Sequence, residues 1–207
     1  MAPSYSSLKF AASPVVEMSG SSFCFSSSPS LVTQFVAGGS YESDLELLHT
    51  SDWLVKHLRL TRAYFSAFNP IRDTPLENKP ATDPLREHRL YQASFLLRDY
   101  GFCLEELPFK KNGQLPLPAD PKEIWARENL LHQPIEINKA NRNQLLRIPG
   151  IGPKSADSIL QARRLTTLND LALLKKLGIS SPNKAAPFLL LNGRRPTFQL
   201  PLILKWT

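Results

Sequence analysis

The chain has 207 residues, enough for one ordinary domain or two small ones, and 42% of them are hydrophobic, so a core can form. Two cysteines are too few for a disulfide framework or a cysteine-ligated metal site, and no apolar run approaches the ~18 residues of a membrane span. The net charge of +7 is uneven: residues 137–207 carry 12 basic and two acidic residues, whereas the first 136 are net −3, which favours a polyanionic partner for the C-terminal third.

Residues 1–30 form a serine-rich leader. They contain 11 serines, with no helical or strand period, and this composition predicts disorder. The charged start and apolar stretch of a secretory signal are missing, so we expect a soluble, cytoplasmic protein without membrane contact. A serine-rich transit peptide is the alternative, although Lys9 is the only basic residue of this segment.

Two strand-like runs alternate with two helical patterns in the next segment. Residues 31–37 and 62–68 are rich in β-branched and aromatic residues, which predicts strands. Ser43 and Glu46 have the spacing of a capping box at the start of the first helix. Asp83, followed by proline, predicts the N-cap of the second helix.

The strand–helix–strand–helix order over residues 31–106 predicts parallel strands with right-handed crossovers. Two parallel strands alone leave unpaired edges, so this segment looks like part of a larger sheet. Residues 107–134 are proline-rich and loop-like, with one short helical candidate, and we interpret them as a linker or docking strap.

Residues 135–192 predict an all-α domain that begins with a helical hairpin. The stretch LLRIPGIGPKSA, residues 145–156, places two prolines and two glycines between helical patterns. We expect Asn138 to cap the first helix and Ile148 to lie near its end. Gly150 and Gly152 are expected to adopt conformations closed to other residues.

Such a turn presents main-chain N–H groups at a helix N-terminus, where the helix dipole favours a phosphate oxygen. The missing side chains at the two glycines let a phosphate approach the main chain. The predicted contact set is Arg147, Pro149, Gly150, Ile151, Gly152, Lys154 and Ser155.

The stretch LLRIPGIGPKSADSIL resembles the helix-hairpin-helix motif, a sequence-independent binder of the DNA backbone. The resemblance implies that double-stranded DNA is the partner; a tight αα-turn used only for packing is the alternative. A weaker repeat of this pattern follows, LKKLGISSPNKAAPFL, and we expect it to be mainly structural. Its lysines are predicted secondary DNA contacts: Lys175, Lys176 and Lys184.

Several stretches between residues 32 and 192, among them TQFVAGGSYESD, YFSAFNPIRDTPLE and REHRLYQASFLLRDYGF, resemble the C-terminal half of radical-SAM proteins described as DNA modification or repair enzymes. The resemblance implies a mixed fold: two βα units from a partial (βα) barrel, followed by the helix-hairpin-helix domain. Family members bind an iron–sulfur cluster and S-adenosylmethionine. The cluster needs three close cysteines, and only Cys24 and Cys103 occur here, so we expect a truncated form that holds no cofactor.

The leading hypothesis is therefore a DNA-binding module that is inactive as an enzyme when alone. A split enzyme, completed by a chain with the missing barrel half, and a protein-docking helical unit remain open. No catalytic residues are predicted, and the histidines are too scattered for a metal site: His49, His57, His88 and His132. Residues 193–207 form a tail without a predicted role.

Overall fold

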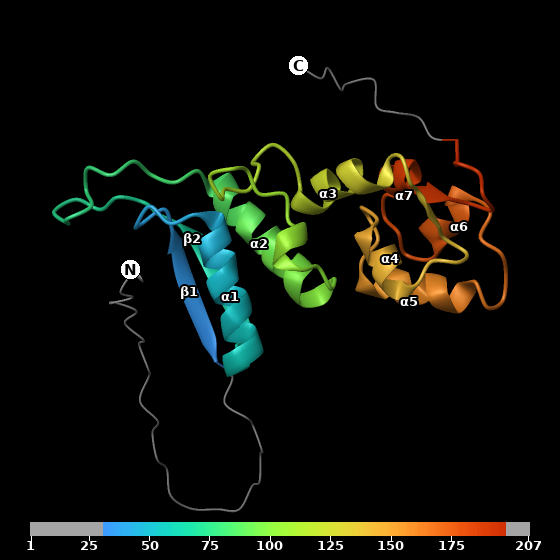
Figure 1. Cartoon of the computed structure of the whole chain (residues 1–207), viewed down its shortest axis with the longest axis horizontal. Coiled ribbons are helices and arrows are strands. Elements are labelled where there is room, and N and C mark those ends of the chain that lie inside the picture. Colours follow the sequence, from blue (N-terminus) through green and yellow to red (C-terminus); the bar gives the residue numbers. More distant parts are fainter. Residues whose placement is uncertain (1–30, 198–207) are drawn as a thin grey trace, which may run out of the picture.

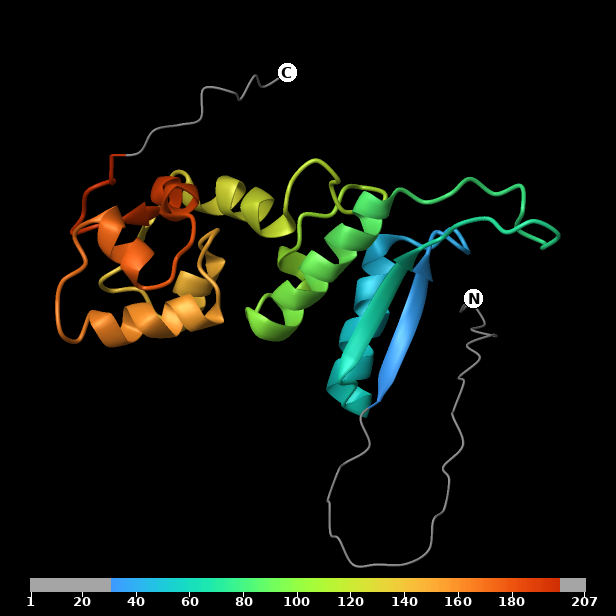
Figure 2. The same cartoon turned by 180° about the vertical axis from the view of Figure 1, so that it is seen from behind.

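The computed structural model describes residues 31–197, which form an α/β unit at one end and a helical unit at the other (Figures 1 and 2). The predicted leader, residues 1–30, and most of the predicted tail, residues 198–207, lie outside the described residues. Within the described part, no helix combines the length and the apolar character needed to cross a bilayer.

The α/β unit has the predicted strand–helix–strand–helix order. Its elements are β1 (Val32–Ala37), α1 (Asp44–Leu58), β2 (Arg62–Ala67) and α2 (Pro84–Asp99). The strands pair in parallel in one continuous register, from Val32 opposite Arg62 to Ala37 opposite Ala67. The parallel arrangement expected from the order of elements is therefore confirmed.

Local capping explains where both helices of this unit begin. The Ser43 hydroxyl accepts a hydrogen bond from the Glu46 N–H, while the Glu46 carboxylate accepts one from the Ser43 N–H. The Asp83 carboxylate accepts from the Leu85 N–H, with Pro84 at the first helical position. Both predicted helix starts are confirmed.

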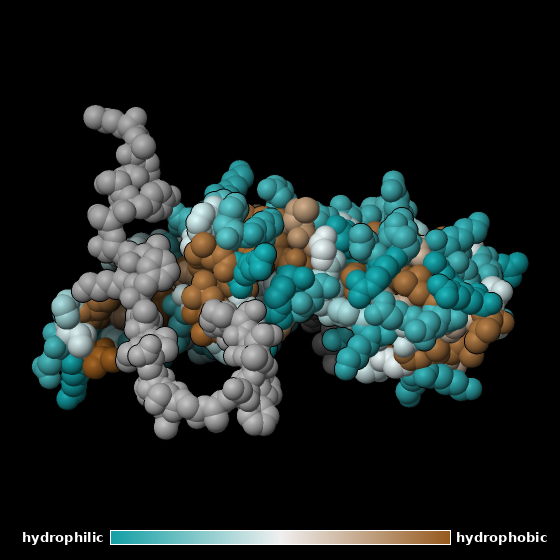
Figure 3. Space-filling view, turned by 90° about the horizontal axis from the view of Figure 1, so that it is seen from below, coloured by the Kyte–Doolittle hydropathy of each residue, from teal (hydrophilic) through white to brown (hydrophobic). Residues whose placement is uncertain are grey.

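The two helices cover only one face of the sheet. Phe35 and Phe65 lie on the covered face and stack with their ring centroids 5.7 Å apart. Figure 2 shows both helices on the same side of the strands. On the opposite face the side chains of Val32, Val36 and Tyr64 are exposed. In Figure 3 hydrophobic residues are visible on both units among mainly hydrophilic ones.

The proline-rich strap joins the two units and packs against both. From here on the name strap covers residues 104–134, so that it contains η1 (Leu104–Glu106) as well as α3 (Pro121–Leu130). Leu107 and Leu115 are buried in the core of the α/β unit, whereas Ala126 is buried in the core of the helical unit. Trp125 packs against both cores, so the strap is docked along its length.

The helical unit contains two short hairpins closed by a pair of two-residue strands. Its elements are β3 (Ile135–Glu136), α4 (Arg142–Arg147), α5 (Pro153–Ala162), α6 (Leu171–Lys176), α7 (Pro182–Ala185), η2 (Ala186–Phe188) and β4 (Leu189–Leu190). β3 and β4 pair in parallel and tie the two ends of the unit together. The prediction of an all-α domain is therefore wrong in this detail, because two-residue strands are too short to leave a pattern in the sequence.

The first hairpin helix begins three residues later than the sequence pattern suggests. Asn141 caps α4, and Gln144 completes a capping box with it. The prediction that Asn138 is the cap is wrong, because the glutamine that a capping box needs stands three residues after Asn141. Asn138 instead donates to the Leu168 carbonyl and accepts from the Leu168 N–H, each at 2.9 Å.

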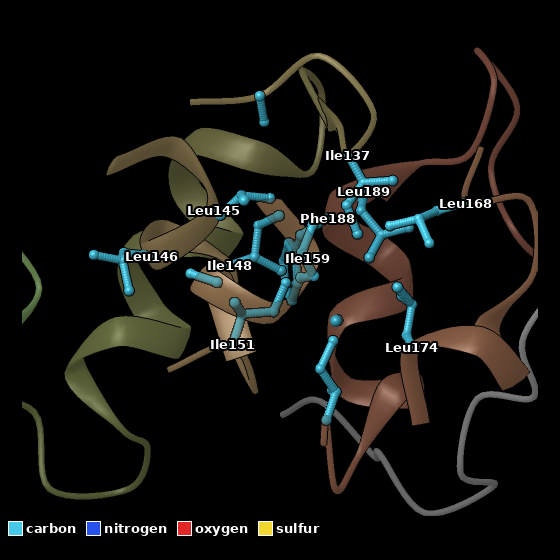
Figure 4. Close-up of a cluster of buried hydrophobic side chains, with 14 of the residues drawn as sticks. Ile137, Leu145, Leu146, Ile148, Ile151, Ile159, Leu168, Leu174, Phe188 and Leu189 are labelled. Carbon is cyan, nitrogen blue, oxygen red and sulfur yellow. The ribbon is translucent and has the colours of Figure 1, made fainter. Parts of the chain in front are cut away.

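The two hairpins share one hydrophobic core. Figure 4 shows Leu145, Ile148, Ile159 and Phe188 converging on its centre, while Leu146 points away from that centre. Among residues 31–197, seventeen buried residues make up the cluster, and they come mainly from both hairpins, α3 and the closing strands. The second hairpin therefore supports the first by direct packing.

Candidate nucleic-acid interface

The turn between α4 and α5 has two glycines with different backbone requirements. Gly150 has a φ of +84°, a left-handed conformation that favours glycine. Gly152 is extended, with φ −101° and ψ 178°, and caps α5 without a side-chain hydrogen bond. The expectation of a glycine-only conformation is met at Gly150 and not at Gly152.

The apolar residue between the glycines anchors the turn. Ile151 is 1% exposed and belongs to the shared core, and its N–H donates to the Ile148 carbonyl at 3.1 Å. Pro149 precedes the exposed Gly150 and ends the α4 pattern because it has no N–H to donate. The buried side chain of Ile151 thus anchors the turn to the core.

Four N–H groups of this turn have no acceptor within residues 31–197. They belong to Gly150, Gly152, Lys154 and Ser155. Three of the four lie at the N-terminus of α5, a helix of ten residues, where the helix dipole adds positive potential. The Lys154 side chain is exposed beside them. The arrangement offers donors and positive charge to an anion.

Four members of the expected contact set do not offer free side chains: Pro149 and Ile151 are buried, and Ser155 and Arg147 make contacts within the protein. The Ser155 hydroxyl donates to the Gly178 carbonyl at 3.3 Å and so connects the two hairpins. The Arg147 guanidinium donates to both carboxylate oxygens of Glu106, at 2.7 and 2.8 Å, and lies 4.4 Å from the centre of the Phe102 ring. Arg147 therefore joins the helical unit to the strap.

Lys122 is a residue that the sequence patterns did not single out. Its side chain is 8% exposed, and its ammonium donates to the Ile151 carbonyl at 2.7 Å, directly beneath the turn. It also lies 4.6 Å from the centre of the Tyr100 ring. Burial lowers the pKa of Lys122 to about 7, against the opposing pull of Asp120. A lysine at the second position of a predicted helix carries no local signal of such burial.

The second hairpin lies directly beside the first. Gly178 has a φ of +88°, close to that of Gly150, so the repeated sequence pattern has the same left-handed glycine in both hairpins. A Cβ placed at Gly150 would lie 3.4 Å from the Ser181 carbonyl oxygen and 3.9 Å from Lys184 Cβ. The turn that carries the free N–H groups is therefore flanked by a lysine of the second hairpin.

A groove of about 470 Å³ opens along the second hairpin. Lys175 and Lys184 both line it, together with Ser180 and Ser181, whereas Lys176 is exposed but does not line it. Two of the three predicted secondary contacts thus face one hollow next to the first turn. The groove extends the basic surface from Lys154 towards α6.

Comparison with known proteins places one motif in this chain. No curated protein and no solved structure matches it significantly. Residues 132–190 match the family model described as the helix-hairpin-helix motif. The match includes α4, α5, α6 and α7, and it therefore contains both hairpins. Residues 132–190 carry a helix-hairpin-helix motif, which suggests binding of nucleic acid.

Proposed function

We propose that this protein binds the backbone of double-stranded DNA, without sequence preference, through the turn between α4 and α5. The observation that carries the proposal is the set of free N–H groups at Gly150, Gly152, Lys154 and Ser155, inside the segment that matches the motif. Main-chain donors recognise phosphate oxygens, which every DNA sequence presents alike.

In this proposal a phosphate oxygen accepts from the N–H groups at the start of α5, and Lys154 supplies a full charge beside it. Lys184 and Lys175 meet neighbouring phosphates across the groove of the second hairpin. Ser155 contributes its N–H, while its hydroxyl remains on Gly178. With only a few phosphates neutralised, we expect a dissociation constant of roughly 10⁻⁴ to 10⁻⁶ M at physiological salt.

A charge deletion at the turn tests the proposal. Lys154→Ala should weaken binding of a labelled 20-base-pair duplex about three-fold and make the slope of log affinity against log salt about 0.9 less negative. Fluorescence anisotropy at several salt concentrations measures both quantities. Two duplexes of unrelated sequence should give the same result, because backbone contacts carry no base information.

Arg164→Ala is the matched control. Arg164 is exposed and lies just beyond the other end of α5, so the variant removes one charge from the same unit without touching the turn. Its affinity and salt slope should stay at the wild-type values. Equal losses in the two variants would mean that binding follows net charge alone, and the turn would then not be the contact.

We further propose that the α/β unit belongs to a radical-SAM enzyme for DNA modification or repair, as the sequence resemblance implies. The support from the structure is the uncovered sheet face with Val32, Val36 and Tyr64, since parallel sheets are normally covered on both faces. Strands supplied by another chain would cover this face and pair with the open strand edges.

The described residues do not fit the cofactor of that family. Within residues 31–197, no three His, Cys, Asp or Glu side chains are gathered to hold a metal, and Cys103 is a single exposed thiol. An iron–sulfur cluster and S-adenosylmethionine would therefore be held by the partner chain. Mixing this protein anaerobically with a candidate partner that carries three clustered cysteines should permit cleavage of S-adenosylmethionine. A colourless and inactive mixture would count against the split enzyme.

A further inference from the structure

A second hollow lies where the two units meet, next to the turn between α4 and α5. It has a volume of about 670 Å³ and is bordered by the C-terminal half of α2, the start of α3 and the first residue of α5. We name it the junction groove. Its aromatic lining residues are Phe95 and Tyr100, and its charged ones are Arg98, Asp99, Asp120 and Lys122.

The walls of the junction groove combine aromatic rings with nearly balanced charge. Phe95 is 41% exposed, with the Arg98 guanidinium 4.9 Å from the centre of its ring, and Tyr100 is half-buried opposite α3. Arg98 donates two hydrogen bonds to Asp99, at 3.0 and 2.9 Å, so the two charges offset each other. These walls suit a flat, uncharged ring with polar edges better than an anion.

The junction groove is continuous with the proposed phosphate contact. Pro153 lines it and stands between Gly152 and Lys154, whose N–H groups are free. A Cβ placed at Gly152 would lie 3.4 Å from the Tyr100 hydroxyl, which shows how closely the groove wall approaches the turn. A nucleotide held there by its phosphate has the groove within reach of its base.

We propose that the junction groove receives the base of an unpaired nucleotide whose phosphate is held at the turn between α4 and α5. The inference rests on the proposed DNA binding and adds a preference for DNA that contains an unpaired nucleotide. A paired base is held in the helical stack, and exposing it is least costly where the nucleotide is unpaired or damaged. Stacking against an aromatic ring then corresponds to roughly a 5- to 150-fold gain in affinity.

Two duplexes that differ by one nucleotide test the inference. One is fully paired, and the other has a single bulged 2-aminopurine nucleotide in the same sequence. We expect the bulged duplex to bind at least five-fold more tightly in an anisotropy competition. We also expect its 2-aminopurine to become protected from quenching by acrylamide. Equal affinity for both duplexes would overturn the junction groove as a base site.

Variants at Phe95 test whether a preference for the bulged duplex depends on the junction groove. Phe95→Ala should remove the preference for the bulged duplex and leave the affinity for the paired duplex unchanged, while Phe95→Tyr should retain the preference. Leu85→Ala is the matched control, because Leu85 is also an exposed apolar residue of α2 but does not line the groove. A preference that survives Phe95→Ala would overturn the assignment.

The outcomes separate this inference from the proposed function. If both duplexes bind equally and Lys154→Ala weakens both, the turn binds DNA and the junction groove holds no base. If neither duplex binds, the proposed function and the inference fail together. Displacement of the bulged duplex by a micromolar concentration of free nucleoside would show that the junction groove binds a soluble ligand. That result would overturn the proposal that it receives a base of the DNA strand.

Discussion

Gly150 and Gly152 are two residues apart, yet their missing side chains serve different purposes. Gly150 is needed for its left-handed backbone, since its φ is +84°. Gly152 has an extended backbone that any residue adopts, and a Cβ there would make only a 3.4 Å contact with the Tyr100 hydroxyl. Folding explains the first glycine, and access of an anion to the main chain is our proposal for the second.

Alanine substitutions should separate these two roles. Gly150→Ala should lower the free energy of unfolding by about 1–2 kcal/mol, because the left-handed conformation is strained for a residue with a Cβ. Gly152→Ala should cost no more than about 1 kcal/mol, the difference expected between glycine and alanine at a helix N-cap. Urea unfolding measures both values. Loss of stability in Gly152→Ala, with none in Gly150→Ala, would contradict the backbone assignment.

The stability of the protein should depend on pH through Lys122. Its pKa is about 7 in the folded state and near 10.5 when unfolded, so between these values the unfolded chain binds more protons. The free energy of unfolding should therefore rise with pH over this window, by about 2 kcal/mol from pH 7 to pH 9 relative to Lys122→Met.

Urea unfolding of wild type and Lys122→Met at both pH values checks this difference. Comparing the two proteins cancels the groups that they share, and Lys122→Met has no titrating group at this position. A difference between them that is the same at pH 7 and pH 9 would mean that Lys122 keeps an ordinary pKa.

At the scale of elements, local signals identified most of the boundaries. Ser43 with Glu46 and Asp83 with Leu85 fix helix starts through hydrogen bonds within a few residues, and Pro153 fixes the start of α5 through its restricted φ. The repeated glycine spacing likewise indicated the second hairpin, whose Gly178 has the same backbone conformation as Gly150.

What the sequence patterns missed are contacts between distant residues. The Arg147–Glu106 pair spans 41 positions, and the Lys122 bond to Ile151 spans 29. An arginine beside a glycine turn predicts a phosphate contact, whereas Arg147 pairs with Glu106. No local pattern indicates that a carboxylate from the strap takes this guanidinium, since only the docking of the strap brings them together.

At the scale of the whole molecule, the strap holds the two units together through a few specific contacts. Trp125 packs against both cores, and Arg147 lies against Phe102 and Trp125 while it pairs with Glu106. Within the described residues, Nη1 of Arg147 has no hydrogen-bond partner, whereas its Nη2 donates to both carboxylate oxygens of Glu106. The junction groove lies at the same boundary.

Removing the negative charge at Glu106 should weaken this boundary. Glu106→Gln should lower the free energy of unfolding by about 1 kcal/mol, a modest value because both side chains are partly exposed. Asp52→Asn makes the same change in the pair of Asp52 with Lys56, whose lysine side chain is 66% exposed, and should have no measurable effect. Urea unfolding compares the two variants, and equal effects would mean that the Arg147 pair adds nothing specific.

The ammonium of Lys122 lies on the inner side of the loop whose outer side is offered to a nucleic acid. A polyanion that arrives there favours the charged form of the lysine, which is about half populated near neutrality. Capture of a strand should then take up a proton from the medium. Association at this loop becomes an acid–base event as well as an electrostatic one, and mild acidity should strengthen it although the DNA phosphates themselves stay ionised.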